Sequence, residues 1–138
     1  MADHNTDIVN EFRNNDGKVG GYFAGANLVL MTTTGARTGE KRVSPVMSFQ
    51  KDGKVYVIAS KGGADTHPAW FHNMKKNPAV GVELATGDGI ETFEATAVEV
   101  PRAERDVLYA EFAADKPGFA EYEKKTTRVI PIVELQRN

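Results

Sequence analysis

Short runs rich in β-branched and aromatic residues, separated by glycine-rich turns, dominate the pattern of apolar and polar positions along this chain. Runs of this kind are typical of β-strands. The sequence Lys51-Asp52-Gly53-Lys54 is a signal for a hairpin between two of them. Pro45 lies inside one run and indicates an edge or a bulge, because proline donates no ladder hydrogen bond. We expect strands at residues 27–34, 41–49, 55–60, 79–84, 90–100 and 128–135.

Four further segments have the apolar spacing of amphipathic helices: residues 6–13, 67–78, 101–115 and 117–126. Pro68 and Pro101 fit the first turn of two of them. The strands follow one another mostly through hairpins rather than through crossover helices. This order favours an antiparallel sheet or small barrel. The expected fold is mainly β (α+β), with helices packed on the outside.

The length of 138 residues indicates one domain, residues 1–138, with a short N-terminal helical segment at about residues 5–18. The formal net charge of −2 argues against a nucleic-acid-binding protein, so any anion site has to be a local cluster of cations. The absence of cysteine excludes disulfides and thiolate chemistry. No apolar run is long enough to span a membrane and no signal-peptide pattern is present, so we expect a cytoplasmic protein.

The sequence contains no motif for a self-contained catalytic site. The patterns GxSxG, GxxxxGKS/T, GxGxxG and HExxH are all missing. His67 and His72 lie about 140° apart around a helix, so they cannot bind one metal ion from one helix face. Either a cofactor supplies the chemistry or the protein is not an enzyme.

Three cations lie in one glycine-bounded turn and in the strand that follows it: Arg37, Lys41 and Arg42. Guanidinium and ammonium groups beside the N–H groups of a turn form a site for an anion. The threonine run at 32–34 adds hydroxyl donors at the same rim. The alternative is a solvated hairpin tip without a ligand.

Three other segments are candidates for ligand contact. At residues 60–64 a glycine pair follows an apolar strand and lets a flat ligand approach the backbone, although an ordinary loop has the same composition. In the next helix, Trp70 and Phe71 fit a core-packing role, whereas His72 and Asn73 lie on other faces. A third cluster, which fits either an apolar substrate pocket or helix packing, consists of Phe112, Phe119 and Tyr122.

The chain resembles the deazaflavin-dependent nitroreductase family in TTTGARTGEKRVSP (32–45), VIASKGGADTHPAWFHNMKKNP (57–78) and RVIPIVEL (128–135). This is the quinone- and nitro-reducing branch of the flavin/deazaflavin oxidoreductases, whose cofactor is reduced coenzyme F420. The resemblance covers about residues 14–135 in the same order. It implies a split β-barrel similar to FMN-binding split barrels, and an enzyme that transfers a hydride from reduced F420 to a quinone, an enone or a nitroaromatic compound.

The resemblance also implies which residues form the site, and it implies no metal. Ser60 would hydrogen-bond near the deazaflavin ring or the acceptor oxygen, and Tyr122 would orient the acceptor or deliver a proton, so both are candidate catalytic residues. Phe112, Phe119 and Tyr122 would line the substrate pocket. The candidate cofactor-binding residues are Arg37, Thr38, Lys41, Arg42, Val43, Ser44, Pro45, Met47, Ile58, Ala59, Ser60, Lys61, Ala69, Trp70, Phe71, His72 and Asn73.

The sequence departs from the family pattern in two places. Arg37 stands where members often carry lysine, which keeps the charge and changes its geometry. Phe119 and Lys116 replace two tyrosines of relatives that activate bulky nitro drugs, whereas Tyr122 matches a third. Activation of nitro drugs is therefore less expected than reduction of quinones.

Three other interpretations stay open from the sequence: an FMN-binding split-barrel reductase, a non-catalytic deazaflavin carrier, and an interaction domain whose cationic turn is a docking surface. FMN lacks a glutamate tail, so it has less use for three clustered cations. The resemblance also suggests a monomer with a small-molecule acceptor. Ile8, Val9 and Phe12 are too few for firm membrane anchoring, so we expect at most transient contact with the inner face of the cell membrane.

Overall fold

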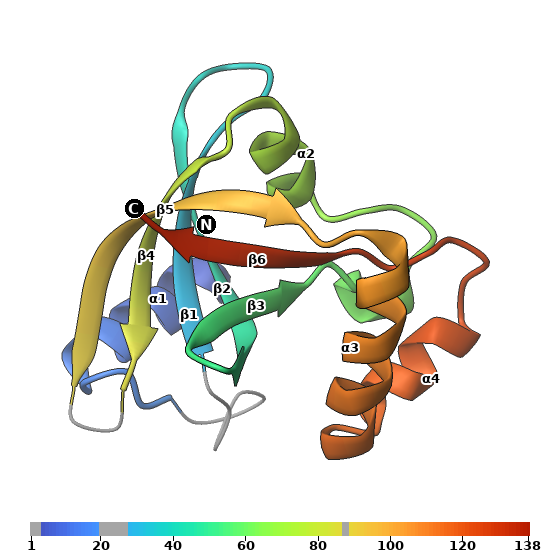
Figure 1. The fold of residues 1–138 in the computed structure, drawn as a ribbon. Helices are drawn as coiled ribbons and strands as arrows, with labels where there is room; N and C mark the ends of the chain where they lie inside the picture. Colours follow the sequence, from blue (N-terminus) through green and yellow to red (C-terminus); the bar gives the residue numbers. More distant parts are fainter. Residues whose placement is uncertain (1–3, 20–27, 87–88) are drawn as a thin grey trace.

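Strands and helices follow one another in the order that the sequence predicts (Figure 1). This computed structural model describes residues 4–19, 28–86 and 89–138, without the side chains of residues 4–6. None of the helices in these ranges is long and apolar enough to cross a membrane. The elements are α1 (His4–Asn14), β1 (Leu28–Thr34), β2 (Lys41–Lys51), β3 (Lys54–Ile58), the 3-10 turn η2 (Lys61–Gly63), α2 (Ala69–Lys76), β4 (Ala79–Ala85), β5 (Ile90–Glu99), α3 (Arg102–Asp115), α4 (Gly118–Lys124) and β6 (Ile132–Arg137).

The strands form a closed antiparallel barrel in the order β1-β2-β3-β6-β5-β4. The expected small antiparallel barrel with helices on its outside is thereby confirmed. Strand β2 pairs with β1 over residues 41–47 and with β3 over residues 48–51. Pro45 belongs to the first stretch, opposite Leu30, so its missing N–H costs no hydrogen bond to β3.

The β2–β3 hairpin and the start of β6 differ in how well local sequence predicts them. Asp52 and Gly53 have φ angles of 54° and 77°, which is the backbone of a type I′ turn and confirms the hairpin. The last strand begins at Ile132, so the prediction of a strand from residue 128 is wrong. The physical reason is that both partner strands end there, because the last residue of β3, Ile58, pairs with Ile132, and the last residue of β5, Glu99, pairs with Val133. The sequence Thr86-Gly87-Asp88-Gly89, which joins the strands expected at 79–84 and 90–100, lies partly outside the described residues.

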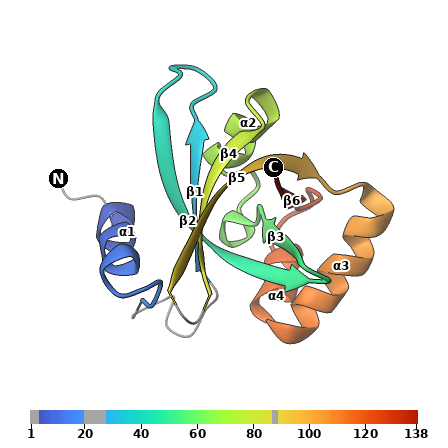
Figure 2. The same cartoon turned by 60° about the vertical axis from the view of Figure 1, so that its left-hand side comes forward.

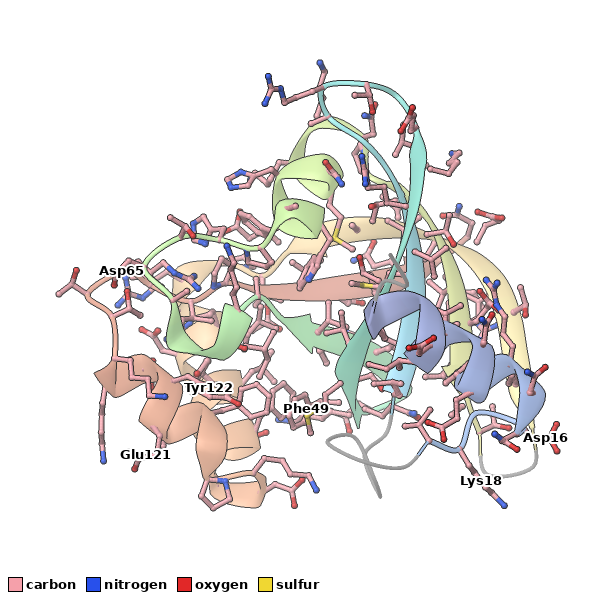
Figure 3. All side chains as sticks on the ribbon, turned by 180° about the vertical axis from the view of Figure 1, so that it is seen from behind. Asp16, Lys18, Phe49, Asp65, Glu121 and Tyr122 are labelled. Atoms are coloured by element: carbon pink, nitrogen blue, oxygen red, sulfur yellow. The ribbon has the colours of Figure 1, made fainter. Side chains whose placement is uncertain are left out.

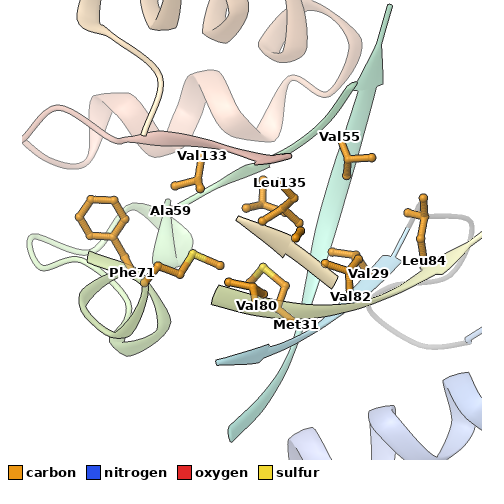
Figure 4. Packing of buried hydrophobic residues seen from close by; sticks show 13 residues of the cluster. Val29, Met31, Val55, Ala59, Phe71, Val80, Val82, Leu84, Val133 and Leu135 are labelled. Carbon is orange, nitrogen blue, oxygen red and sulfur yellow. The ribbon is translucent and has the colours of Figure 1, made fainter. Parts of the chain in front are cut away.

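Three hydrophobic clusters hold the barrel and its helices together. The first fills the barrel and is closed at one end by Phe71 and Met74 of α2, and Figure 4 shows part of it. The second joins α3 and α4 to the outer face of β2, β3 and β6, and the third joins α1 to the outer face of β1. Figure 2 shows α1 on one side of the barrel and the α3–α4 pair on the other. The alternating burial of the strands decides which residues face which cluster.

Candidate functional site

A groove of about 530 Å³ lies between the β1–β2 turn and the first turns of α2, which lie side by side at the top of Figure 1. Two cations, Arg37 and Arg42, border it from the turn and from β2. Backbone and small side chains form the rest of its wall. The lining residues are Gly35, Ala36, Arg37, Thr38, Arg42, Ala69 and Asn73.

The β1–β2 turn is held in one shape by its own backbone. The Gly35 N–H donates to the Glu40 carbonyl at 2.8 Å, and the Gly39 N–H donates to the Gly35 carbonyl at 3.0 Å. Gly39 has a φ of 75°, which favours glycine. A Cβ on Gly35 would lie 3.0 Å from Thr38 Oγ1, so the turn leaves little room for a larger residue there. The expected tight connection with glycine at both ends is confirmed.

Asn73 of α2 joins the helix to the turn from the other side of the groove. Its Oδ1 accepts a hydrogen bond from the Ala36 N–H at 2.9 Å, and its Nδ2 donates to Thr33 Oγ1 at 3.3 Å. Lys76 adds a third link because its Nζ donates to the Ala36 carbonyl at 2.9 Å. Asn73 is only 8% exposed, so its amide mainly positions the turn. The structural roles of Asn73 and Lys76 gave no separate signal in the sequence.

The alternation of β2 sends its neighbouring residues to opposite faces. Arg42 pairs with Thr33, the residue that bonds Asn73, and therefore shares the groove side of the strand. Lys41 pairs with Thr34, and its Nζ donates to Thr34 Oγ1 at 2.9 Å on the other side. Of the remaining candidates on β2, Ser44 shares the face of Arg42, whereas Val43, Pro45 and Met47 share the face of Lys41.

The charge around the groove fits a ligand that carries several negative charges. Arg37 and Arg42 are exposed, and Thr38 adds a hydroxyl between them. Arg42 Nη2 lies 3.8 Å from the carboxylate of Glu40. Both side chains of this ion pair are mostly exposed, so the pair contributes little to stability. Two guanidinium groups can therefore bind phosphate or carboxylate groups with paired hydrogen bonds. The phosphate and glutamate tail expected for F420 has this chemistry.

The loop after β3 carries the segment expected to contact the cofactor ring. Ile58 and Ala59 are buried in the hydrophobic clusters, so their side chains are covered and only their backbone can reach a ligand. Ser60 is 8% exposed and Lys61 is exposed. Lys61 and Gly63 have φ angles of 48° and 88°, so the chain makes an unusual bend at this point.

The same loop lies directly against α4. A Cβ placed on Gly63 would come within 3.0 Å of the Tyr122 carbonyl oxygen and 3.1 Å of Lys125 Cβ. Glycine therefore permits a close approach that another residue would prevent. The loop that carries Ser60 and the helix that carries Tyr122 are consequently neighbours, although 62 positions separate these two residues in the sequence.

The three residues predicted for the substrate pocket belong to one aromatic cluster. Phe49 stacks on Phe112 with ring centroids 4.5 Å apart, and Phe119 lies 5.3 Å from Phe49 and 5.4 Å from Tyr122. Phe112 and Phe119 are each 6% exposed, whereas Tyr122 is half-buried. Figure 3 shows Tyr122 beside Phe49. Of the three, Tyr122 has the most exposed side chain, whereas Phe112 lines a cavity of about 430 Å³ between β2 and α3.

Arg128 and His67 are residues near the site that the sequence did not single out for binding. Arg128 donates hydrogen bonds to carbonyl groups of the loop after β3, and its Nη1 lies 2.8 Å from His67 Nδ1. Burial, the Arg128 charge and His72 together lower the pKa of His67 below 6.5. A single arginine ahead of an apolar run is indistinguishable from an ordinary strand residue, so no sequence pattern reveals this contact.

The remaining α2 candidates have different exposures. Ala69 lines the groove, His72 is exposed, and Trp70 is half-buried and packs against the barrel cluster. Phe71 is buried in that cluster and closes the barrel. Ala69 and Asn73 therefore border the groove, whereas Trp70 and Phe71 pack in the core.

A family model described as F420H(2)-dependent quinone reductase matches residues 6–137. The F420H(2)-dependent quinone reductase of Mycobacterium tuberculosis strain H37Rv is 33% identical over 133 residues, which cover 91% of this chain and 85% of that protein. The solved structure of an F420-H2 dependent reductase, FDR-A, is 40% identical, covers 80% of this chain and 94% of that chain, and has a TM-score of 0.67. Another structure, described as a domain-swapped dimer, is 37% identical, covers 95% and 93%, and has a TM-score of 0.69.

The sequence match spans nearly the whole chain and includes the barrel, the cationic turn and the loop after β3. The groove has the charge that the tail of F420 requires, which agrees with that match. On these findings the chain belongs to the F420H(2)-dependent quinone reductase family, a family of oxidoreductases whose cofactor is coenzyme F420.

Proposed function

We propose that this protein reduces quinones with F420H2 bound in the groove between the β1–β2 turn and α2. The observation that carries the proposal is the pair of exposed guanidinium groups, Arg37 and Arg42, on a groove that the backbone and Asn73 hold in shape. These cations bind the phosphate and the glutamate tail. The ring then extends toward the loop that carries Ser60 and Lys61.

Reduced F420, when bound, supplies a hydride from carbon C5 of its ring. The protein contributes position and electrostatics, and the hydride transfer needs no strong base from it. Ser60 orients the ring or the acceptor oxygen by a hydrogen bond. The Tyr122 hydroxyl orients the acceptor and gives a proton to a quinone oxygen. Hydride and proton together convert the quinone into the hydroquinone.

The proposal also includes acceptors other than quinones. Enones and nitroaromatic compounds accept a hydride in the same way as quinones. Phe119 and Lys116, in place of tyrosines, leave Tyr122 as the hydroxyl donor expected on this side of the site. Bulky nitro drugs are therefore expected to be poorer acceptors than menadione.

The test mixes the protein with F420H2 and menadione and follows oxidation of the cofactor by its absorbance. We expect a rate well above the protein-free rate. The double variant Arg37→Gln/Arg42→Gln should need far more cofactor to reach that rate. Arg137→Gln, which removes an exposed guanidinium on β6, is the control and should behave as the unchanged protein. A wild-type rate equal to the protein-free rate at saturating cofactor contradicts the proposal.

A titration distinguishes F420 from FMN. Both have a tricyclic ring, but FMN lacks the glutamate tail that the two guanidinium groups bind. We expect F420 to bind more tightly than FMN, and we expect its affinity to fall as salt is added. Fluorescence of each cofactor provides the measurement. Tighter binding of FMN, insensitive to salt, would favour the split-barrel FMN reductase instead, and tight F420 binding without turnover would favour the carrier.

The oligomeric state and the location in the cell are further expectations from the family resemblance. A monomer has a mass of 15.1 kDa, which light scattering during gel filtration distinguishes from a dimer. One similar structure is a domain-swapped dimer, so a doubled mass is the outcome that would correct this expectation. A cytoplasmic protein in transient contact with membranes should not sediment with anionic vesicles at low salt.

A further inference from the structure

Arg128, in the loop before β6, bonds four acceptors on a single loop of the chain. Its Nε donates to the Ala64 carbonyl at 2.8 Å, and its Nη2 donates to the Ser60 carbonyl at 2.8 Å and the Ala59 carbonyl at 3.2 Å. Its Nη1 contacts His67 Nδ1 at 2.8 Å. A planar guanidinium can make these bonds together, whereas an ammonium cannot. The residues bonded lie between β3 and α2, the two elements that border the expected cofactor site.

The contact with Arg128 defines the protonation state of His67. Arginine remains protonated in proteins and only donates, so His67 Nδ1 has to be the acceptor. The ring is therefore neutral with its proton on Nε2. Protonation of Nδ1 would replace this hydrogen bond by two like charges at 2.8 Å.

The bonded loop contains an unfavourable backbone conformation. Lys61 has a φ of 48°, a left-handed conformation that is unfavourable for a residue with a side chain. Gly63 is pressed against the Tyr122 carbonyl oxygen, as described above. The Gly63 N–H donates to the Ser60 carbonyl, and the Ala64 N–H donates to the Lys61 carbonyl. Because Arg128 bonds three carbonyl groups of this short stretch, it stabilises the bend from outside.

We propose that Arg128, with neutral His67 as its fourth acceptor, is a positioning residue that holds residues 59–64 in the shape required to bind the ring of the cofactor. The part of the proposal that concerns the cofactor rests on the proposed function. Arg128 acts through the loop, because four of its five N–H donors bond the loop carbonyls and His67. Through Gly63 the same bonds also fix the distance between the Ser60 loop and α4, which carries Tyr122.

The proposal implies that acid loosens the loop. Several charged groups surround His67 in addition to Arg128, and most of them are cations. Glu99 favours protonation of His67, but it forms an ion pair with Lys75 at 2.7 Å, and burial opposes protonation. A cavity of about 290 Å³ lies beside His67, between α2 and α3. The charged or titratable groups that face His67 or line this cavity are His72 and Lys75 on α2, Glu99 on β5, and Arg102 and Arg105 on α3.

Amide hydrogen exchange tests the loop without any cofactor. The readout is the protection of the Gly63 and Ala64 amides between about pH 8 and about pH 5, corrected for intrinsic exchange. We expect protection in the wild type to fall about tenfold or more once His67 is protonated. The Gly35 amide in the β1–β2 turn, bonded to Glu40, is the internal control and should keep its protection.

Two variants of His67 separate titration from packing. In His67→Asn the amide oxygen can replace Nδ1 as acceptor and does not titrate, so protection of Gly63 and Ala64 should stay high at every pH. In His67→Leu the acceptor is removed, so protection should be low at every pH. An acid-dependent loss in His67→Asn equal to that of the wild type overturns the proposal. Full protection in His67→Leu would also overturn it.

Steady-state kinetics tests the effect on the cofactor. Arg128→Lys keeps the charge and loses the four-acceptor geometry, so the KM for F420H2 should rise about tenfold or more. The KM for menadione should change much less. Arg137→Lys is the matched control on β6 and should leave both constants unchanged. A general loss of folded protein would lower kcat at an unchanged KM, so that result in Arg128→Lys contradicts a positioning role.

The two experiments distinguish failure of this inference from failure of the proposed function. If the wild type does not oxidise F420H2, the proposed function fails and amide exchange still decides the role of Arg128. If the wild type is active and Arg128→Lys has the KM of Arg137→Lys, the proposed function stands and the inference is overturned.

Discussion

Adjacent cations in this chain have different surroundings because a strand sends successive side chains to opposite faces. Arg42 lies on the side of β2 that borders the groove, and Lys41 lies on the other side, bonded to Thr34. The sequence places both in one cationic cluster. Only the pairing register with β1 separates the residue that reaches the groove from the residue that does not.

A pair of substitutions measures this separation. Arg42→Gln and Lys41→Gln each remove one positive charge, but only the first removes a charge from the groove. We expect Arg42→Gln to weaken F420 binding about tenfold, from the loss of a charged hydrogen bond, and Lys41→Gln to change it by less than about threefold. Fluorescence titration at low and high salt provides both affinities. Equal losses in the two variants would show that the register does not select the binding residues.

Two glycines of this chain have similar backbone conformations but different surroundings. Gly53 in the β2–β3 hairpin and Gly63 in η2 have φ angles of 77° and 88°. Nothing lies within 4 Å of a Cβ placed on Gly53, whereas Gly63 faces the Tyr122 carbonyl. The hairpin glycine is thus required by a local turn, and the second glycine is required by a turn and by packing on α4.

Alanine substitution separates these two requirements. Gly53→Ala should lower the free energy of unfolding by about 1–2 kcal/mol, the cost of a left-handed alanine. Gly63→Ala should cost at least about 1 kcal/mol more, because the added methyl group displaces α4 from the loop. Urea denaturation measures both losses, and only Gly63→Ala should also raise the KM for F420H2. If Gly63→Ala lowers the free energy of unfolding no more than Gly53→Ala does, α4 moves away from the added methyl group at no cost in stability, which contradicts this prediction.

At the scale of the whole molecule, the site is assembled by contacts between parts that are distant in the sequence. Asn73 forms hydrogen bonds with Ala36 of the β1–β2 turn and with Thr33 of β1, and Arg128 forms them with the loop after β3. The barrel keeps these parts together because its interior cluster includes residues from β1, β3, β4, β5, β6 and α2, with Val46 of β2 packed against it. A change at the Arg128–His67 contact should therefore be visible in the stability of the whole protein.

The pH dependence of stability follows from the lowered pKa of His67. An unfolded histidine takes up a proton near pH 6.5, whereas the folded protein resists protonation until a lower pH because of burial and Arg128. The contribution is complete above pH 6.5 and is lost as the pH falls through the folded pKa. The free energy of unfolding should therefore decrease in this window.

Urea denaturation at a series of pH values measures the effect, and His67→Asn provides the comparison. The variant should lack the decrease in this window, since asparagine does not titrate. The lowered pKa of Asp106, caused by hydrogen bonds from Arg105 and Arg102, contributes only at more acidic pH, below the usual carboxyl value of 3.8. Parallel curves for the two proteins as the pH falls from 6.5 through the His67 window would contradict the assignment to His67.

Much of the fold could be predicted from the sequence because its signals are local. The Lys51-Asp52-Gly53-Lys54 hairpin, the proline-started helices and the order of strands and helices all follow from neighbouring residues. The resemblance carried by residues 32–45 and 57–78 also indicated the family. The prediction of a strand from residue 128 is wrong because its partners β3 and β5 end opposite Ile132 and Val133, which the local sequence does not reveal.

The sequence by itself determined the element types, the turns, the cationic cluster and the family, since each depends on residues that are close along the chain. Tertiary structure alone decided that Arg42 and not Lys41 borders the groove, that Asn73 supports the turn, and that Arg128 holds the loop of Ser60. The reason is geometric. Register and long-range hydrogen bonds depend on how the barrel closes, and closure brings together residues whose separation in sequence carries no signal.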